Sequence, residues 1–336
     1  MPTISDVAAR AGVSTKTVSR VLNGEPHVRP QLKERVRAAV AELDYQPNLA
    51  ARQLAANRSF LIVYLYTTVR ASYVATLLGA ASRRCRELGY HLIAEPVEDS
   101  SDAAALVADL VSRLRPDGIL LSPPLSDEAD LLDALQRAAV PVARIAGTRP
   151  GVGDIIDIDH RAISAEMTEH LIALGHRRIG FIAATREFRL ALGRLAGFRD
   201  AMGRAGIAID EELVVNGNFT FLSGYHAAAL LLAHRSPPTA IFAANDEMAA
   251  GVVSAAGQRG LRVPDDVAIA GFDDSPISRM IWPPLTTVRQ PVAELAVAAI
   301  DRLTGRPPGK DPIEHRLVIR ASTTGSGGIV EEGPDL

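Results

Sequence analysis

Five polar side chains near the N-terminus have the chemistry needed to read DNA. They are Thr15, Lys16, Ser19, Arg20 and Asn23. Lys and Arg donate hydrogen bonds to guanine edges, whereas Ser, Thr and Asn suit phosphate oxygens or adenine. The apolar residues between them, Val18, Val21 and Leu22, have the spacing of the opposite face of a helix. The pattern therefore predicts a DNA-reading helix, and the alternative is an ordinary solvated face in a helical bundle.

The sequence on either side predicts the helices that position such a reader. Apolar residues recur at i, i+3, i+4 and i+7 from Ile4 to Ala11, which predicts a first helix. Gly12 interrupts it, and Ser14 is placed to cap the second helix. A third helix is expected over residues 30–43. Two helices joined by a glycine turn and braced by a third form a helix-turn-helix.

Positive charge is concentrated in the same segment. Residues 1–58 carry nine Lys and Arg against five Asp and Glu, a net charge of +4, whereas the whole chain carries −3 and the remainder therefore −7. A basic segment in an acidic protein is the electrostatic pattern expected of phosphate binding. The charge distribution thus favours DNA binding over a merely solvated helix face.

Beyond residue 58, short β-rich runs alternate with amphipathic helical stretches. The first series covers 60–66, 91–97, 117–122 and 141–146, and the second covers 178–184, 213–219, 240–245 and 267–272. Strands that alternate with helices of 10–15 residues predict doubly wound parallel sheets. Two such series in tandem predict two similar lobes with a cleft between them.

The ends of these expected strands offer a ligand site. Ligands bind outside the carboxyl ends of parallel strands, which selects Phe219, Asn245 and Asp273. The carboxylate and the amide can bond to adjacent hydroxyls, and the ring can cover an apolar face of a sugar. The structural alternatives are that Phe219 belongs to the core and that Asp273 and Asp274 cap the next helix.

Composition and motifs limit the remaining possibilities. Apolar residues make up 47% of the chain, yet no run of about 18 of them occurs, and the N-terminus enters the first expected helix directly, so we expect no membrane span and no leader. The single cysteine, Cys85, is expected to be a buried structural thiol in a cytoplasmic protein. No phosphate-binding loop, HExxH, CxxC or GxSxG motif occurs. We therefore predict no enzymatic activity, no cofactor and no metal site.

Several longer strings together resemble the LacI/GalR family of bacterial transcription regulators. They are TISDVAARAGVSTKTVSRVLNG (3–24), LGHRRIGFI (174–182), RLAGF (194–198), AIFAANDEMAAG (240–251), VAIAGFDD (267–274) and PPLTTVRQP (283–291). The resemblance extends to about residue 323. It implies that Thr15, Lys16 and Arg20 contact base edges. It also implies that Ser19 and Asn23 contact phosphates.

The resemblance further implies a hinge helix over residues 47–56 that orders only on DNA. Its DNA contacts would come from Asn48, Ala51 and Leu54, with Leu54 wedged into the minor groove. A helix of about ten residues is marginal in isolation, and an inserted apolar side chain kinks the duplex at a cost that added contacts offset. The alternative is that Leu54 packs against the larger part of the chain.

On the ligand side, matching the family's motifs adds Arg194 and Gln290 to the expected pocket. Tyr73 stands where the family has an aromatic residue in a pattern like NPFF, but this chain reads Ala-Ser-Tyr-Val over 71–74, which leaves the ligand open. Asp159 is expected to orient either the crossover between lobes or the ligand. The alternative for Arg194 is a pair with a surface carboxylate.

We therefore expect an all-α helix-turn-helix head (1–46), a hinge (47–58) and a ligand-sensing α/β part (59–330) with two lobes of periplasmic-binding-protein type. The family implies three crossings, with lobe 1 at 59–158 and 289–320 and lobe 2 at 159–288 and 321–330. The expected function is a repressor of carbohydrate-utilisation genes, with operator DNA and a sugar-like effector as partners. The expected assembly is a homodimer, because a two-fold operator needs two copies of the reader. The tail lacks leucine heptads, which argues against the four-chain assembly that some relatives form. A solute-binding protein and a sugar-modifying enzyme are the alternatives.

Overall fold

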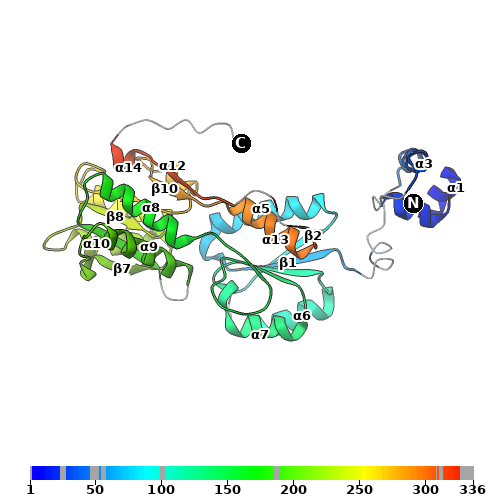
Figure 1. The fold of residues 1–336 in the computed structure, drawn as a ribbon, viewed down its shortest axis with the longest axis horizontal. Coiled ribbons are helices and arrows are strands. Elements are labelled where there is room, and N and C mark those ends of the chain that lie inside the picture. The colour runs from blue at the N-terminus through cyan, green and yellow to red at the C-terminus, as the bar shows by residue number, and fades with distance from the viewer. Residues whose placement is uncertain are drawn as a thin grey trace. The chain divides into compact units, whose positions relative to one another are not determined.

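The computed structural model describes residues 2–22, 28–45, 53, 58–98, 103–184, 189–307, 309 and 313–325. The chain divides into two compact units, Met1–Ser59 and Phe60–Leu336. Figure 1 labels the helices and strands of each unit. In the part of the chain that is described, no helix is both long enough and apolar enough to cross a membrane.

Residues 2–22 and 28–45 of the head unit form three helices. They are α1 (Ile4–Ala11), α2 (Thr15–Leu22) and α3 (Pro30–Glu42). Thr3 and Asp6 form a reciprocal capping box that begins α1. Gly12 ends α1 with φ 61°, a left-handed conformation that glycine adopts without a steric penalty. Val7, Val18 and Val36, one from each helix, are fully buried together, which confirms the predicted helix-turn-helix.

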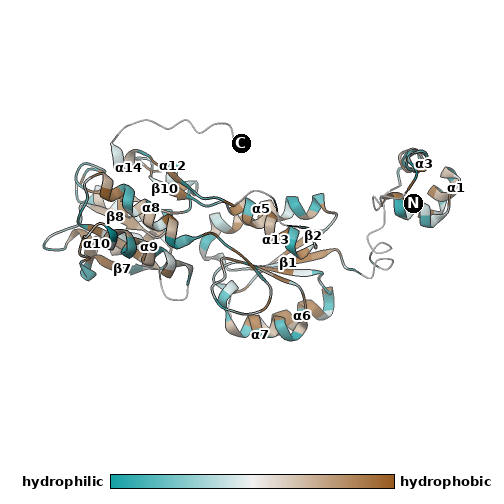
Figure 2. Cartoon of the chain, viewed as in Figure 1, coloured by the Kyte–Doolittle hydropathy of each residue, from teal (hydrophilic) through white to brown (hydrophobic). Residues whose placement is uncertain are grey.

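The first lobe of the larger unit is built on a parallel five-stranded sheet. Its strands, in the order β2-β1-β3-β4-β5, are β2 (His91–Pro96), β1 (Leu61–Tyr66), β3 (Gly118–Leu121), β4 (Val142–Ile145) and β5 (Asp154–Ile156). Its helices are α5 (Ala71–Glu87), α6 (Ala103–Leu114), α7 (Ala129–Ala138) and α13 (Val292–Leu303). In Figure 2, α5 and α13 alternate between brown and teal, as expected of helices with one apolar face.

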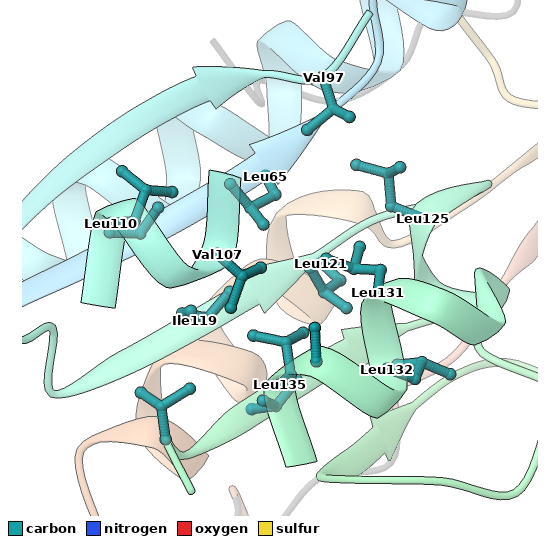
Figure 3. Packing of buried hydrophobic residues seen from close by; sticks show 14 residues of the cluster. Leu65, Val97, Val107, Leu110, Ile119, Leu121, Leu125, Leu131, Leu132 and Leu135 are labelled. Carbon is teal, nitrogen blue, oxygen red and sulfur yellow. The ribbon is translucent and has the colours of Figure 1, made fainter. Parts of the chain in front are cut away.

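The core of the first lobe lies between the sheet and the helices α6 and α7. Figure 3 shows Ile119 and Leu121 of β3 facing Val107 of α6 and Leu135 of α7. These four side chains are almost completely buried. Full burial of such a side chain stabilises the fold by about 1.5–3 kcal/mol, so this cluster sets a rigid base for the ends of the strands.

The second lobe repeats the plan with a parallel four-stranded sheet. Its strands, in the order β7-β6-β8-β9, are β7 (Val214–Gly217), β6 (Ile179–Ala184), β8 (Ala240–Ala243) and β9 (Ala268–Ala270). Its helices are α8 (His160–Ala173), α9 (Leu190–Arg204), α10 (Phe221–Leu232), α11 (Asp246–Gln258), α12 (Ile277–Met280) and α14 (Ala321–Thr324). Short 3-10 turns complete the unit: η1 (Thr68–Arg70), η3 (Leu125–Asp127) and η4 (Glu211–Leu213).

Three chain segments pass between the lobes (Figure 1). The first joins β5 to α8, the second joins β10 (Thr287–Arg289) to α13, and the third joins α13 to β11 (Arg316–Val318). Strands β10 and β11 pair antiparallel next to α8. The third crossing therefore precedes Arg316, a few residues before the boundary expected near residue 320. The strands β5, β10 and β11 were not predicted; each adjoins a crossing between the lobes and lies outside the two predicted series of strands and helices.

Candidate functional site

Helix α2 has the two faces that its sequence predicts. The Ser14 hydroxyl accepts a hydrogen bond from the Thr17 backbone N–H at 3.2 Å and so caps the helix start. Val18 and Val21 are buried in the head. The opposite face, exposed except for the half-buried Ser19, carries Thr15, Lys16, Ser19 and Arg20. Their contacts with DNA remain a prediction.

The turn that presents α2 is tied to the third helix. Arg35 of α3 donates hydrogen bonds to the backbone carbonyls of Ala11 and Gly12. These carbonyls lie at the end of α1, where the intrahelical donors run out. Arg35 therefore holds the angle between α1 and α2. The predicted DNA-contacting residues Asn23, Asn48, Ala51 and Leu54 lie outside the described residues.

The larger unit has a cavity of about 220 Å³ between its lobes. Tyr73 lines it from the first lobe, Asn245 and Asp273 line it from the second, and Gln290 lines it from the second crossing. These four residues were all predicted for the ligand site and are far apart in the sequence. The fold brings them to one pocket, while their contact with a ligand remains a prediction.

Asp273 is the centre of this pocket. Its two carboxylate oxygens accept hydrogen bonds from one nitrogen of Arg70 at 3.0 and 2.9 Å, and Gln290 donates a further bond. A nitrogen of Arg194 lies 3.7 Å away. The backbone at Asp273 has φ 119° and is held by its N–H bond to the Val288 carbonyl. Asp273 is thus bound to side chains of both lobes rather than capping a helix.

Arg70 was not predicted from the sequence. It ends η1 just before α5, is buried, and forms the ion pair with Asp273. Its guanidinium carbon lies 4.3 Å from the Tyr73 ring centroid and 5.1 Å from that of Phe219. Burial alone would lower the pKa of Arg70, but the Asp273 carboxylate outweighs burial and the pKa is raised. The nearest signal was the departure from the family pattern at residues 71–74, which begins one residue after Arg70.

Arg194 and Phe219 are fully buried behind the lining of the cavity. Arg194 donates to the Ala244 carbonyl and lies 3.6 Å from the Phe272 ring centroid. Burial lowers the pKa of Arg194 to about 9, although Asp273 opposes that effect. A surface pair for Arg194 is therefore wrong. Phe219, with φ 68°, is a core residue by burial and still contacts Arg70 across the lobes.

Asn245 and Asp159 both begin helices. The Asn245 amide accepts from the Met248 N–H and donates to the Phe219 carbonyl, each at 3.0 Å. It caps α11 and holds the loop after β7 at the same time. Asp159 is exposed, accepts from the Arg161 and Ala162 N–H groups, and does not line the cavity. Asp159 thus lies at the crossover as the cap of α8 and outside the cavity lining, while a contact with a ligand stays untested.

Two more buried carboxylates stabilise the loop after β9. Asp274 accepts from Arg320 at 2.7 Å and from Arg289 at 2.6 Å. Burial raises its pKa, but these arginines outweigh burial and lower it overall. Asp246 accepts from the Ser275 N–H at 2.7 Å, and burial, assisted by Asp273, raises its pKa well above the ordinary value. These bonds fix the loop that carries Asp273.

Comparisons with known proteins agree with this architecture. A family described as bacterial regulatory proteins, lacI family, matches residues 3–48, and a periplasmic binding protein-like domain matches residues 168–323. The transcriptional repressor PurR of Haemophilus influenzae (strain PittEE) is 35% identical over 334 residues, which cover 96% of this chain and 98% of the relative. The ribose operon repressor of Escherichia coli (strain K12) is 36% identical, covering 91% and 93%.

Solved structures are similar over the same length. The Lac repressor dimer bound to operator and the anti-inducer ONPF has a TM-score of 0.76 at 32% identity, covering 96% of this chain and 99% of that one. The complex of the transcriptional regulator CelR with cellobiose has a TM-score of 0.71 at 33% identity, covering 96% and 100%. The described head and two-lobed unit match these proteins from end to end. The chain belongs to the lacI family of bacterial regulatory proteins and is a helix-turn-helix transcriptional regulator.

Proposed function

We propose that this protein represses carbohydrate-utilisation genes in the bacterial cytoplasm. It binds a palindromic operator as a homodimer, and a sugar or related metabolite in the cavity between the lobes sets its affinity for DNA. One observation carries the proposal. The carboxylate of Asp273 gathers Arg70 from one lobe, Arg194 from the other and Gln290 from the crossing.

A ligand in this cavity necessarily changes contacts between the lobes. Arg70 and Asp273 are joined across the cavity, so a ligand that bonds to either one competes with their pair. A ligand shifts an equilibrium only by its difference in affinity for the two states. A ligand that competes with the Arg70–Asp273 ion pair has different affinities for the state in which the lobes are joined by this pair and the state in which they are not. The hinge at 47–58 is then the segment through which lobe movement alters operator affinity.

The similar proteins support both partners. The Lac repressor structure is a dimer bound to operator, and the CelR structure is a complex with cellobiose. A dimer also suits the helix-turn-helix, because two heads related by a two-fold axis read two half-sites.

Exposed apolar side chains support a surface for the second copy. On α10, Phe221, Leu222 and Leu230 are exposed. Met280, the last residue of α12, is 79% exposed, and Trp282 after it is 77% exposed. Helix α11 packs against both α10 and α12, so both stretches belong to one lobe. We assign these exposed side chains to the contact with the second copy.

The proposal is tested by operator selection. Full-length protein is used to select binding sites from random duplex DNA, and affinity for the selected site is measured by fluorescence anisotropy over a salt series. We expect a palindrome and a steep salt dependence. Thermal unfolding and anisotropy are then repeated with a panel of mono- and disaccharides, because a ligand of the folded state stabilises it. Sugar binding without sequence-specific DNA binding supports a solute-binding protein instead, and conversion of a sugar supports an enzyme.

A further inference from the structure

The buried polar atoms around Asp273 divide unevenly between donors and acceptors. Among the described residues, six buried side-chain nitrogens have no hydrogen-bond partner, and no buried side-chain oxygen is in that position. Three of these nitrogens belong to the two arginines beside Asp273: Nε of Arg70, and Nε and Nη2 of Arg194. Two more belong to His160, whose neutral ring has one donor and one acceptor nitrogen; its Nε2 lies 3.3 Å from an Asp157 oxygen without hydrogen-bond geometry.

The acceptors in the same place are already engaged. Asp273 accepts from Arg70 and Gln290, and Asp246 accepts from Ser275 and Thr287. Of the other carboxylates near the arginines or in the cavity lining, Asp157 and Glu247 are only partly buried and Glu294 is exposed. Water therefore screens the rim carboxylates more than the inner guanidiniums. The interior offers free N–H groups and positive charge but little free acceptor capacity.

This balance distinguishes between classes of ligand. A neutral sugar presents hydroxyls, each of which needs an acceptor as well as a donor. A carboxylate or phosphoryl group only accepts, and arginine binds either one through paired, charge-assisted bonds. Both arginines are nine-tenths or more buried, and their free nitrogens lie within one ion-pair network with Asp273.

We propose that the effector is an anionic sugar derivative, either a sugar acid or a sugar phosphate, whose anionic oxygens bond to Arg70 and Arg194. The inference rests on the proposed effector pocket and names the chemistry that the pocket selects. Arg70 exchanges Asp273 for the ligand anion, and the Asp273 carboxylate then accepts from the sugar hydroxyls. Arg70 is thus the residue that determines specificity.

The experiment compares matched ligands at constant ionic strength on the full-length protein. The sets are glucose, gluconate and glucose 6-phosphate; galactose, galacturonate and galactose 1-phosphate; and ribose, ribonate and ribose 5-phosphate. Affinity is measured by calorimetry and by thermal unfolding. We expect the acid or the phosphate of at least one set to bind about tenfold or more tightly than its neutral parent. Tighter binding of the acid identifies the effector as a sugar acid, and tighter binding of the phosphate identifies it as a sugar phosphate.

Variants link that preference to the residue. Arg70→Met removes the anion preference, Arg70→Lys retains part of it, and Arg86→Met, which removes an exposed arginine from the same helix α5, leaves it unchanged. Retention of the preference in Arg70→Met overturns the proposal. Circular dichroism checks that the variants are folded. If Arg70→Met does not fold, the anion preference of Arg70→Lys is compared with that of the wild type instead.

Two further outcomes are decisive. A neutral sugar that binds as tightly as its acid and phosphate, and that alters operator affinity, overturns the anionic class while leaving the proposed regulator intact. If no sugar binds, inorganic phosphate at about 50 mM must still stabilise the wild type, relative to chloride, more than Arg70→Met, because anion binding acts by mass action. Equal stabilisation of the two proteins overturns the inference, and operator binding then tests the proposed function separately.

Discussion

Each charged residue of the pocket depends on a partner from a distant part of the chain. Arg70 and Asp273 are separated by 203 residues and pair at 2.9 Å. The sequence could place Asp273 at a strand end by a general rule of parallel sheets. It could not place Arg70, since an arginine after a strand is usually solvated.

Replacement of Asp273 by Asn is expected to abolish the ligand response and to destabilise the larger unit. The change keeps the shape but leaves Arg70 and Arg194 buried without their carboxylate. Loss of one partner of a buried pair costs about 3–5 kcal/mol. Urea unfolding and operator anisotropy with and without effector measure both effects.

The matched control is Asp265→Asn. Asp265 pairs with Arg262 at 3.2 Å on the surface, where both side chains are more than half exposed. Such a pair contributes about 0–1 kcal/mol. Equal destabilisation by the two substitutions would show that Asp273 has no special role in holding the pocket.

Because His160 is buried, we expect the folded protein to lose stability on acidification. His160 is buried beside Phe272, and burial, chiefly, lowers its pKa below the ordinary 6.5. The unfolded chain therefore binds a proton at His160 that the folded chain does not. Stability is complete above the unfolded pKa and falls as pH drops below it, by at most about 1.4 kcal/mol per pH unit for one group. His170 and His176, whose pKa values burial also lowers, act with the same sign.

The measurement is urea unfolding of wild type and His160→Gln between about pH 7.5 and 5.5, where histidine titrates. The variant should lose less stability over this interval than the wild type, whatever its stability at the upper pH. Parallel pH dependences of the two proteins would exclude His160 as a source of the effect.

At the scale of helices, close packing depends on single glycines. A Cβ at Gly251 of α11 would lie 2.2 Å from the Phe221 carbonyl and 2.6 Å from the Tyr225 backbone nitrogen of α10. A Cβ at Gly257, in the same helix, would meet nothing within 4 Å. Periodicity predicted both helices, but only their packing shows which glycine is required.

Gly251→Ala should therefore destabilise the larger unit by about 1–3 kcal/mol or more through overpacking. Gly257→Ala should stabilise it by about 0.4–1 kcal/mol, because alanine restricts the unfolded chain. Thermal unfolding of both variants provides the comparison within one helix. Similar behaviour of the two would contradict the packing of α10 against α11.

The exposed face of helix α2 leads to a prediction about the affinity and sequence preference of DNA binding. Lys16 lies exposed in the first turn of α2, the end of a recognition helix that reaches base edges. Lys16→Ala should weaken binding to the selected operator by about 1–3 kcal/mol and relax its sequence preference. Arg37→Ala, which removes an exposed charge from α3, should not relax that preference. Unaltered specificity in Lys16→Ala would remove this residue from the reading face.

At the scale of the whole molecule, the second copy is expected to cover the exposed apolar side chains of the second lobe. A charge placed at Leu222 or Trp282 should break that contact, since a buried unpaired charge is costly. Leu222→Glu and Trp282→Glu should shift a dimer to a monomer at micromolar concentration and weaken operator binding, with ligand binding retained. Sedimentation equilibrium measures the assembly. A wild-type monomer that binds its operator fully would defeat the proposed homodimer.

By itself, the sequence determined the kind of protein: the head helices, two series of alternating strands and helices, and four of the residues that line the pocket. These follow from local periodicity, turn residues and strand ends, which short stretches of chain encode. Only the tertiary structure decided which of those residues meet. It joined Arg70 to Asp273 and buried Arg194, because partnership and burial depend on segments that are distant in the sequence. It also showed that Asp159, for which the sequence left two roles open, caps α8 through local hydrogen bonds.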